Sequence, residues 1–72
     1  MEANKSAVRG EYQYSLGLRN GRICLYCWHG ATEPRDYESM DFPATVEDFN
    51  SFDGLEPQLW FAFAAQLIGD RR

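Results

Sequence analysis

Apolar and polar residues alternate on both sides of the dipeptide Asn20-Gly21, through residues 12–18 and 23–28. An alternation with a period of two is typical of β-strands, because successive side chains point to opposite faces of the sheet. Asn-Gly between two such runs favours a two-residue type I′ turn. The pattern therefore predicts a β-hairpin that turns at Asn20 and Gly21.

The two-residue loop fixes which residues face each other across this hairpin. We expect Leu18 opposite Ile23, Tyr14 opposite Cys27, and Gln13 opposite Trp28. A slip of one residue would turn every side chain to the other face, so the apolar pattern specifies this register. The face expected to form the core carries Tyr12, Tyr14, Leu16, Leu18, Ile23, Leu25 and Cys27. The other face carries Gln13, Ser15, Gly17, Arg19, Arg22, Cys24, Tyr26 and Trp28.

Residues 35–42 predict a third strand, with Met40 and Phe42 on one face. Pro43 ends this strand, because proline has no N–H to donate to the sheet. Residues 45–54 predict a helix, since Thr45 is a favourable N-cap, acidic residues fill the first turn and a glycine closes the segment. Val46, Phe49 and Phe52 are its inward-facing candidates.

Residues 55–72 predict a second helix. Pro57 suits its first turn and Gly69 suits its end, where two arginines favour the negative pole of the helix dipole. The helix is apolar on nearly all sides, apart from Gln58 and Gln66. Such a helix is either buried or shared with a partner.

These elements predict an α+β fold, a three-stranded antiparallel β-meander with one face covered by two C-terminal helices, in the order β-β-β-α-α. The chain has 72 residues, which indicates a single domain over residues 1–72. Residues 1–10 are expected to be a flexible or loosely attached N-terminus. Because 44% of the residues are apolar, the chain can build the dense core that a small domain needs.

The charge of the chain limits the classes of partner. Eleven acidic residues oppose seven basic ones, for a net charge of −4. Direct binding to nucleic acid is not expected, because that affinity depends on neutralising phosphates. The longest apolar run is far shorter than the roughly 20 residues of a membrane span, so no membrane contact is expected. Two cysteines without an apolar leader indicate reduced thiols and a cytoplasmic location.

Cys24, Cys27 and His29 form the cluster that most resembles a chemical site. The two cysteines are three residues apart in a strand, so their side chains should point to opposite faces. A tetrahedral zinc site needs four ligands, and the c-type haem attachment motif is C-x-x-C-H, which Trp28 interrupts here. We therefore expect no metal, no cofactor and no catalytic residues. A small metal or redox protein that uses these three residues is kept as a third interpretation.

Charge is segregated along the chain. Residues 33–56 contain eight acidic residues and one basic residue, Arg35. Such a segment is either a solvated edge that keeps the protein soluble, or a negative field that steers the protein onto a basic surface of another protein. The sequence leaves both interpretations open.

Tyr26 and Trp28 lie on the face of the hairpin that the core does not use. Large aromatic residues over small ones are either cross-strand packing or the composition of a binding hot spot. Combined with the acidic segment, they lead to the hypothesis of one partner-binding face. Its members are Tyr26, Trp28, Glu33, Asp36, Tyr37, Glu38, Asp41, Glu47 and Asp48.

In its length, in the hairpin "YSLGLRNGRICLYCW" that leads to the acidic "EPRDYESMDF", and in its lack of a catalytic set, the chain resembles small acidic inhibitors encoded by phages, anti-CRISPR proteins among them. The resemblance is one of class and rests on no shared motif. It implies a non-enzymatic inhibitor that blocks a basic, nucleic-acid-binding protein, such as a CRISPR-Cas or other defence complex in a bacterial cytoplasm. The alternative is a homodimeric interaction or structural module that pairs through its C-terminal helix, with Phe61 as the contact.

Overall fold

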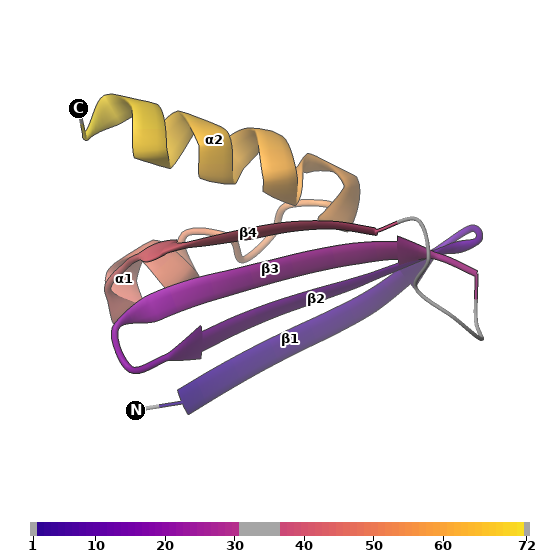
Figure 1. The fold of residues 1–72 in the computed structure, drawn as a ribbon, viewed down its shortest axis with the longest axis horizontal. Coiled ribbons are helices and arrows are strands. Elements are labelled where there is room, and N and C mark those ends of the chain that lie inside the picture. The colour runs from indigo at the N-terminus through magenta and orange to yellow at the C-terminus, as the bar shows by residue number, and fades with distance from the viewer. Residues whose placement is uncertain (1, 31–36, 72) are drawn as a thin grey trace.

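The computed structural model describes residues 2–30 and 37–71, and over this range the chain forms a four-stranded antiparallel sheet with its helices on one side (Figure 1). The strands follow one another in the order β1-β2-β3-β4. The α+β class with an antiparallel sheet is confirmed. The elements are β1 (Glu2–Arg9), β2 (Tyr12–Arg19), β3 (Arg22–His29), β4 (Tyr37–Pro43), α1 (Val46–Asn50), the 3-10 turn η1 (Pro57–Leu59) and α2 (Trp60–Asp70).

The hairpin of β2 and β3 has the predicted turn and the predicted register. Asn20 has a φ of 53° and Gly21 a φ of 74°, and a type I′ turn needs this left-handed backbone at both central residues. Leu18 pairs with Ile23 and Gln13 pairs with Trp28. The hairpin therefore separates an apolar face from a polar and aromatic face as the alternation predicts.

The first correction concerns the number of strands. Residues 2–9, expected to be loosely attached, form β1 and pair with β2 along their whole length, from Glu2 opposite Arg19 to Arg9 opposite Tyr12. Gly10 opens the connecting two-residue turn with a φ of 63°, as a type II′ turn favours. Ala3 and Ala7 pack on the core from this strand. The apolar signal was weak because these side chains are small.

The second correction concerns the helices, since the fold has one helical segment of substantial length, Pro57–Asp70, rather than two. In place of the helix expected at 45–54, α1 has five residues. After α1 the backbone forms turns in which an amide donates a hydrogen bond to the carbonyl three residues earlier. One such bond joins the Phe52 amide to the Phe49 carbonyl at 3.2 Å. These turns bury Phe52, which is 1% exposed, whereas Val46 faces solvent.

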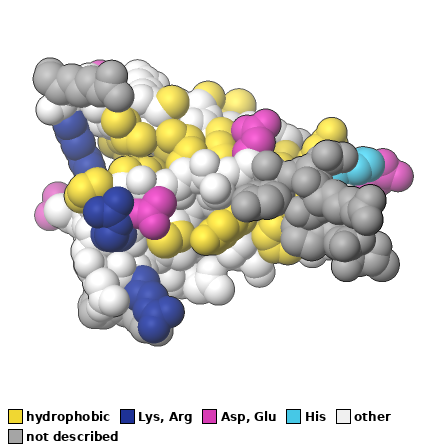
Figure 2. All heavy atoms as spheres, viewed as in Figure 1, with side chains coloured by type: hydrophobic (Ala, Val, Ile, Leu, Met, Phe, Trp, Pro, Cys, Tyr) yellow, Lys and Arg dark blue, Asp and Glu magenta, His cyan; other side chains and the backbone are white. Residues whose placement is uncertain are grey.

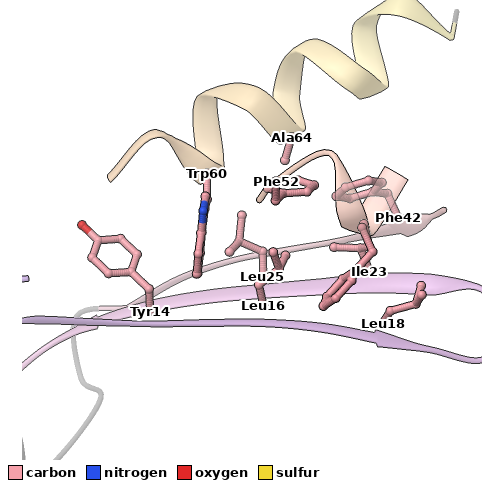
Figure 3. Close-up of a cluster of buried hydrophobic side chains, with 10 residues drawn as sticks. Tyr14, Leu16, Leu18, Ile23, Leu25, Phe42, Phe52, Trp60 and Ala64 are labelled. Carbon is pink, nitrogen blue, oxygen red and sulfur yellow. The ribbon is translucent and has the colours of Figure 1, made fainter. Parts of the chain in front are cut away.

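The core fills the space between the sheet and the helices (Figure 3). Leucine and isoleucine side chains of β2 and β3 point towards the helices, and Trp60 and Ala64 of α2 point towards the sheet. The edge of the Trp60 ring meets the Tyr14 ring, with centroids 6.2 Å apart. The members of the core are Tyr14, Leu16, Leu18, Ile23, Leu25, Phe42, Phe49, Phe52, Trp60 and Ala64.

Helix α2 directs its large apolar side chains towards the sheet. Trp60 is buried, and Phe61 and Phe63 are half-buried against the core. Phe63 stacks edge-on against Phe52, with ring centroids 4.8 Å apart. The exposed positions of the helix include Ala62, Ala65 and Gln66. The helix is therefore amphipathic in the size of its side chains, although its sequence is apolar on nearly all sides.

The two successive residues Leu25 and Tyr26 give a direct test of the sheet's two faces. Leu25 is fully buried, so Leu25→Ala should lower the free energy of unfolding by about 2–5 kcal/mol, most of the stability of a small domain. Tyr26 is exposed on the opposite face, so Tyr26→Ala should cost less than about 1 kcal/mol. Urea unfolding of the two variants measures the difference. Equal losses would contradict the assignment of the faces.

Candidate functional site

Within residues 2–30 and 37–71, one face of the sheet has no helix over it, because α1, η1 and α2 all lie on the other side (Figure 1). We call it the open face. The strand register arranges it in rows across the sheet. One row runs Asn4, Gly17, Cys24 and Asp41; the next runs Ser6, Ser15, Tyr26 and Ser39; and the third begins with Val8, Gln13 and Trp28.

The open face is hollowed along β1 and β2. One shallow depression is bordered by Asn4, Ser15, Gly17, Cys24 and Tyr26. A second is bordered by Ser6, Val8, Gln13, Ser15 and Trp28, and the two meet at Ser15. We call the pair the trough. Its floor is low because Ser6 and Ser15 lie in the row of Tyr26, and because Gly17 lies in the row of Cys24. Tyr26 and Trp28 form its wall.

Gly17 lowers the floor of the trough because it has no side chain. The backbone at this position does not require glycine. A Cβ built at this position would lie 3.8 Å from the Ala3 carbonyl oxygen and 3.9 Å from Asn4 Oδ1, which are ordinary contact distances. A side chain would therefore fit here and would fill part of the depression. Trp28 is half-buried, and Tyr26 is 43% exposed. The aromatic wall is thus accessible to a partner.

A small polar network lies beside the trough. Arg22 Nε donates to Asp41 Oδ1 at 2.6 Å, and the Cys24 thiol donates to Asp41 Oδ2 at 3.4 Å. The bond from Arg22 lowers the pKa of the Asp41 carboxyl, whereas partial burial and then the bond to Asp41 raise the pKa of the Cys24 thiol. At neutral pH Cys24 is therefore a protonated thiol and a weak nucleophile.

The fold pairs the basic N-terminal residues with the acidic C-terminal ones. Lys5 forms an ion pair with Asp53, and Arg9 Nη2 lies 3.4 Å from Glu56 Oε2. Arg71 forms an ion pair with Asp48, which also accepts a 2.9 Å bond from the Thr45 amide. The segregation of charge along the sequence is therefore balanced in part within the molecule. Figure 2 shows the visible Lys and Arg side chains gathered at the end that carries the β2–β3 turn.

The residues expected to make one partner-binding face are divided between the two sides of the sheet. Tyr26, Trp28 and Asp41 lie on the open face. Glu38 lies opposite Cys27, in a row of the helix-covered face, and Glu47 and Asp48 belong to α1 on that same side. Glu33 and Asp36 lie outside the described residues. Tyr37 occupies the position opposite Trp28, but its side chain also lies outside what the structure describes.

Cys24, Cys27 and His29 do not come together, and the two cysteines lie on opposite faces of the sheet, as their spacing predicted. Cys27 lies on the core side, where burial raises the pKa of its thiol. His29 Nε2 lies 2.8 Å from Glu11 Oε2, and its ring is tilted against Tyr12 with centroids 5.0 Å apart. In residues 2–30 and 37–71, no group of three or more His, Cys, Asp or Glu side chains is arranged to hold a metal ion.

Seven residues of the trough were absent from the expected face: Asn4, Ser6, Val8, Gln13, Ser15, Gly17 and Cys24. Gly17 and Ser15 could have been noticed, because the predicted register places small residues opposite Cys24 and Tyr26 on the same face. Asn4, Ser6 and Val8 could be placed only by recognising β1 as a strand. The one local sign of this strand in the sequence is Gly10-Glu11, a possible two-residue turn between Arg9 and Tyr12.

Comparisons with protein-family models, with curated proteins and with solved structures gave no match to this chain. Of the helices within the described residues, none has the length and apolar character needed to cross a lipid bilayer.

Asp48 gives a pH test of the link between α1 and the C-terminal end of α2. The bond from the Thr45 amide, followed by the ion pair with Arg71, lowers the Asp48 pKa below its ordinary value of 3.8. A lowered pKa in the folded state stabilises the fold at pH values above 3.8, and this stabilisation is lost as the pH falls through the folded-state pKa. Asp48→Asn should cost about 1 kcal/mol at neutral pH.

Urea unfolding of the wild type and of Asp48→Asn, at neutral pH and then below pH 3.8, measures this effect. The difference between the two proteins should shrink as the pH falls, because the wild-type carboxylate becomes protonated. Glu47→Gln is the matched control, since Glu47 is exposed and has no ion pair among the described residues. A difference that stayed constant with pH would show that the asparagine disturbs packing instead.

Proposed function

We propose that this protein is a non-enzymatic binding module that recognises another protein through the trough of the open face. The observation that carries this proposal is the uncovered trough itself, with a low floor at Gly17 and an accessible aromatic wall of Tyr26 and Trp28. Aromatic residues beside a recess that can accept a partner's side chain are typical of binding hot spots. A partner element that lies along the strands would bury both aromatic rings.

Charge supports a basic partner, and the ion pairs give the acidic residues a smaller role than imitation of a phosphate backbone. Asp41, Asp48, Asp53 and Glu56 already pair with bases of this chain. Glu38 and Glu47 are exposed and have no ion pair within the described range. With a net charge of −4, the molecule attracts a basic surface from a distance, which raises the association rate.

A basic partner of this kind is most simply a protein whose surface normally holds nucleic acid. Occupation of that surface would exclude the nucleic acid, so the proposed activity is inhibition of a nucleic-acid-binding protein or complex. This proposal agrees with the class-level resemblance to phage-encoded inhibitors. The proposal of a non-enzymatic role is supported by the two thiols, whose raised pKa values make them weak nucleophiles at neutral pH.

The trough can be tested with a variant that fills it. Gly17→Val should preserve the fold, because a Cβ fits at this position and valine favours a strand, but it should abolish capture of the partner. Tyr26→Ala should speed dissociation by an amount that corresponds to about 2 kcal/mol or more, the size of a hot-spot contact. The measurement is affinity capture from a bacterial lysate, followed by binding kinetics with the captured protein.

Gln66→Ala is the control for this experiment, because Gln66 is exposed on α2, on the other side of the sheet. It should bind as the wild type does. Capture that survives Gly17→Val and Tyr26→Ala would contradict the trough as the binding site, whatever protein is captured.

The role of charge is tested in the same binding assay. Glu38→Lys combined with Glu47→Lys should slow association and reduce its dependence on salt, while the dissociation rate changes little. The reason is that both side chains are exposed and lie away from the aromatic wall. An unchanged association rate at low salt would show that the partner is not recognised by its positive charge.

A further inference from the structure

β1 is the outermost strand of the sheet on its side, and part of its backbone faces outward. Arg9 and Tyr12 close a two-residue turn, so they form a hydrogen-bonded pair, and such pairs recur at every second residue along the hairpin. The backbone groups of Asn4, Ser6 and Val8 therefore point away from β2. Of these, the Val8 carbonyl accepts a bond from Arg9 Nη1 at 2.9 Å, the one bond to this edge from a side chain or loop among the described residues.

The opposite edge of the sheet carries features that discourage pairing with another strand, and the β1 edge lacks them. β4 contains the exposed acid Glu38, which has no ion pair among the described residues, and it ends at Pro43; charged residues and proline are common protections of edge strands. β1 has eight residues with a regular register, no proline and no bulge. Its free edge is therefore long, regular and suited to pairing.

The charges of Lys5 and Arg9 do not repel an added strand, because each is balanced within the molecule. Lys5 forms an ion pair with Asp53, and its Nζ lies 4.7 Å from the centre of the Phe49 ring. Arg9 is held by Glu56. Both cations are therefore directed towards the segment that follows α1, and their charge is balanced within the molecule.

Two exposed apolar side chains border the β1 edge, one on each face of the sheet. Val8 is 60% exposed on the open face. Leu59 is 52% exposed in η1, which lies against β1 on the helix-covered face. They belong to a small group of large apolar residues that the described part of the chain leaves exposed. A strand added to β1 would cover apolar surface next to its backbone bonds.

We propose that the occupant of this edge is a second copy of the same chain, and that two β1 strands pair antiparallel about a two-fold axis to make one eight-stranded sheet. A register centred on Ser6 uses the outward backbone groups of each copy, with Ser6 opposite Ser6 and Asn4 opposite Val8. The bond from Arg9 to the Val8 carbonyl is replaced by one from the Asn4 amide of the other copy.

This register keeps the basic residues of the two copies apart. Lys5 faces the small Ala7 of the other copy, and Arg9 faces Ala3, so that no like charges are opposed along the strands. A register shifted by one pair would instead place Lys5 opposite Lys5. The proposed dimer differs from one formed through the C-terminal helix, where the exposed positions include Ala62 and Ala65 and the large side chains face the core.

The proposal is tested by sedimentation velocity of the full chain over a range of concentrations. The wild type should show the dimer mass at high concentration, and Ser6→Lys should remain a monomer because it places two lysines together on the two-fold axis. Ser39→Lys is the matched control: Ser39 is also exposed, lies in the same row of the open face and is on the opposite edge strand, so this variant should still dimerise. Gly17→Val, which fills the trough, should also dimerise.

Amide hydrogen exchange gives a second measurement that needs no substitution. The amides of Asn4, Ser6 and Val8 should become protected as the concentration rises, whereas exposed amides at the β4 edge, such as that of Ser39, should not. A wild type that is monomeric at every concentration, or a dimer that Ser6→Lys leaves intact, would overturn the proposal. Loss of the dimer in Ala65→Glu together with its retention in Ser6→Lys would assign the interface to α2 instead.

Discussion

The left-handed backbone of Asn20 and Gly21 is the constraint on which the rest of the molecule depends. Because both residues have a positive φ, they can form a type I′ loop of two residues between β2 and β3. This loop fixes which residues of the two strands face each other. That register places Leu16 and Leu25 on one side and Tyr26 and Trp28 on the other. The first set forms the platform for α2, and the second set forms the wall of the trough. The core and the candidate site are thus the two faces of a single hairpin.

Much of the sheet could be predicted from local patterns, whereas β1 could not. The alternation around Asn20-Gly21 predicted the pairs between β2 and β3 from Arg19–Arg22 to Gln13–Trp28, and Met40 and Phe42 share one face of β4 as predicted, which is the core side. β1 contributes Ala3, Lys5 and Ala7 to the same side. Two alanines on either side of a lysine do not produce the apolar alternation by which a strand is recognised in a sequence. Only the fold shows that Lys5 is half-buried, with its charge balanced by Asp53.

The candidate site was predictable only where it depends on one hairpin. Tyr26 and Trp28 were placed on the correct face because the hairpin alone decides it. The acidic residues were grouped by their nearness in sequence, but a sheet followed by a helix carries neighbouring residues to opposite sides, as with Asp41 and Asp48. The floor of the trough needed the placement of β1 beside β2. The segregation of charge along the chain reflects, in part, ion pairs within the molecule, in which Lys5 and Arg9 pair with Asp53 and Glu56.

The meander order of the sheet has a consequence for how the chain folds. β1 and β2 each pair with the next strand in sequence through a two-residue turn, so these contacts close very short loops. Proteins dominated by such local contacts cross their folding barrier quickly, because little chain entropy is lost before the first contacts form. The hairpin of β2 and β3 is the natural nucleus. Helix α2, whose partners Leu16 and Leu25 lie more than thirty residues earlier in the chain, completes the core on a sheet that already exists.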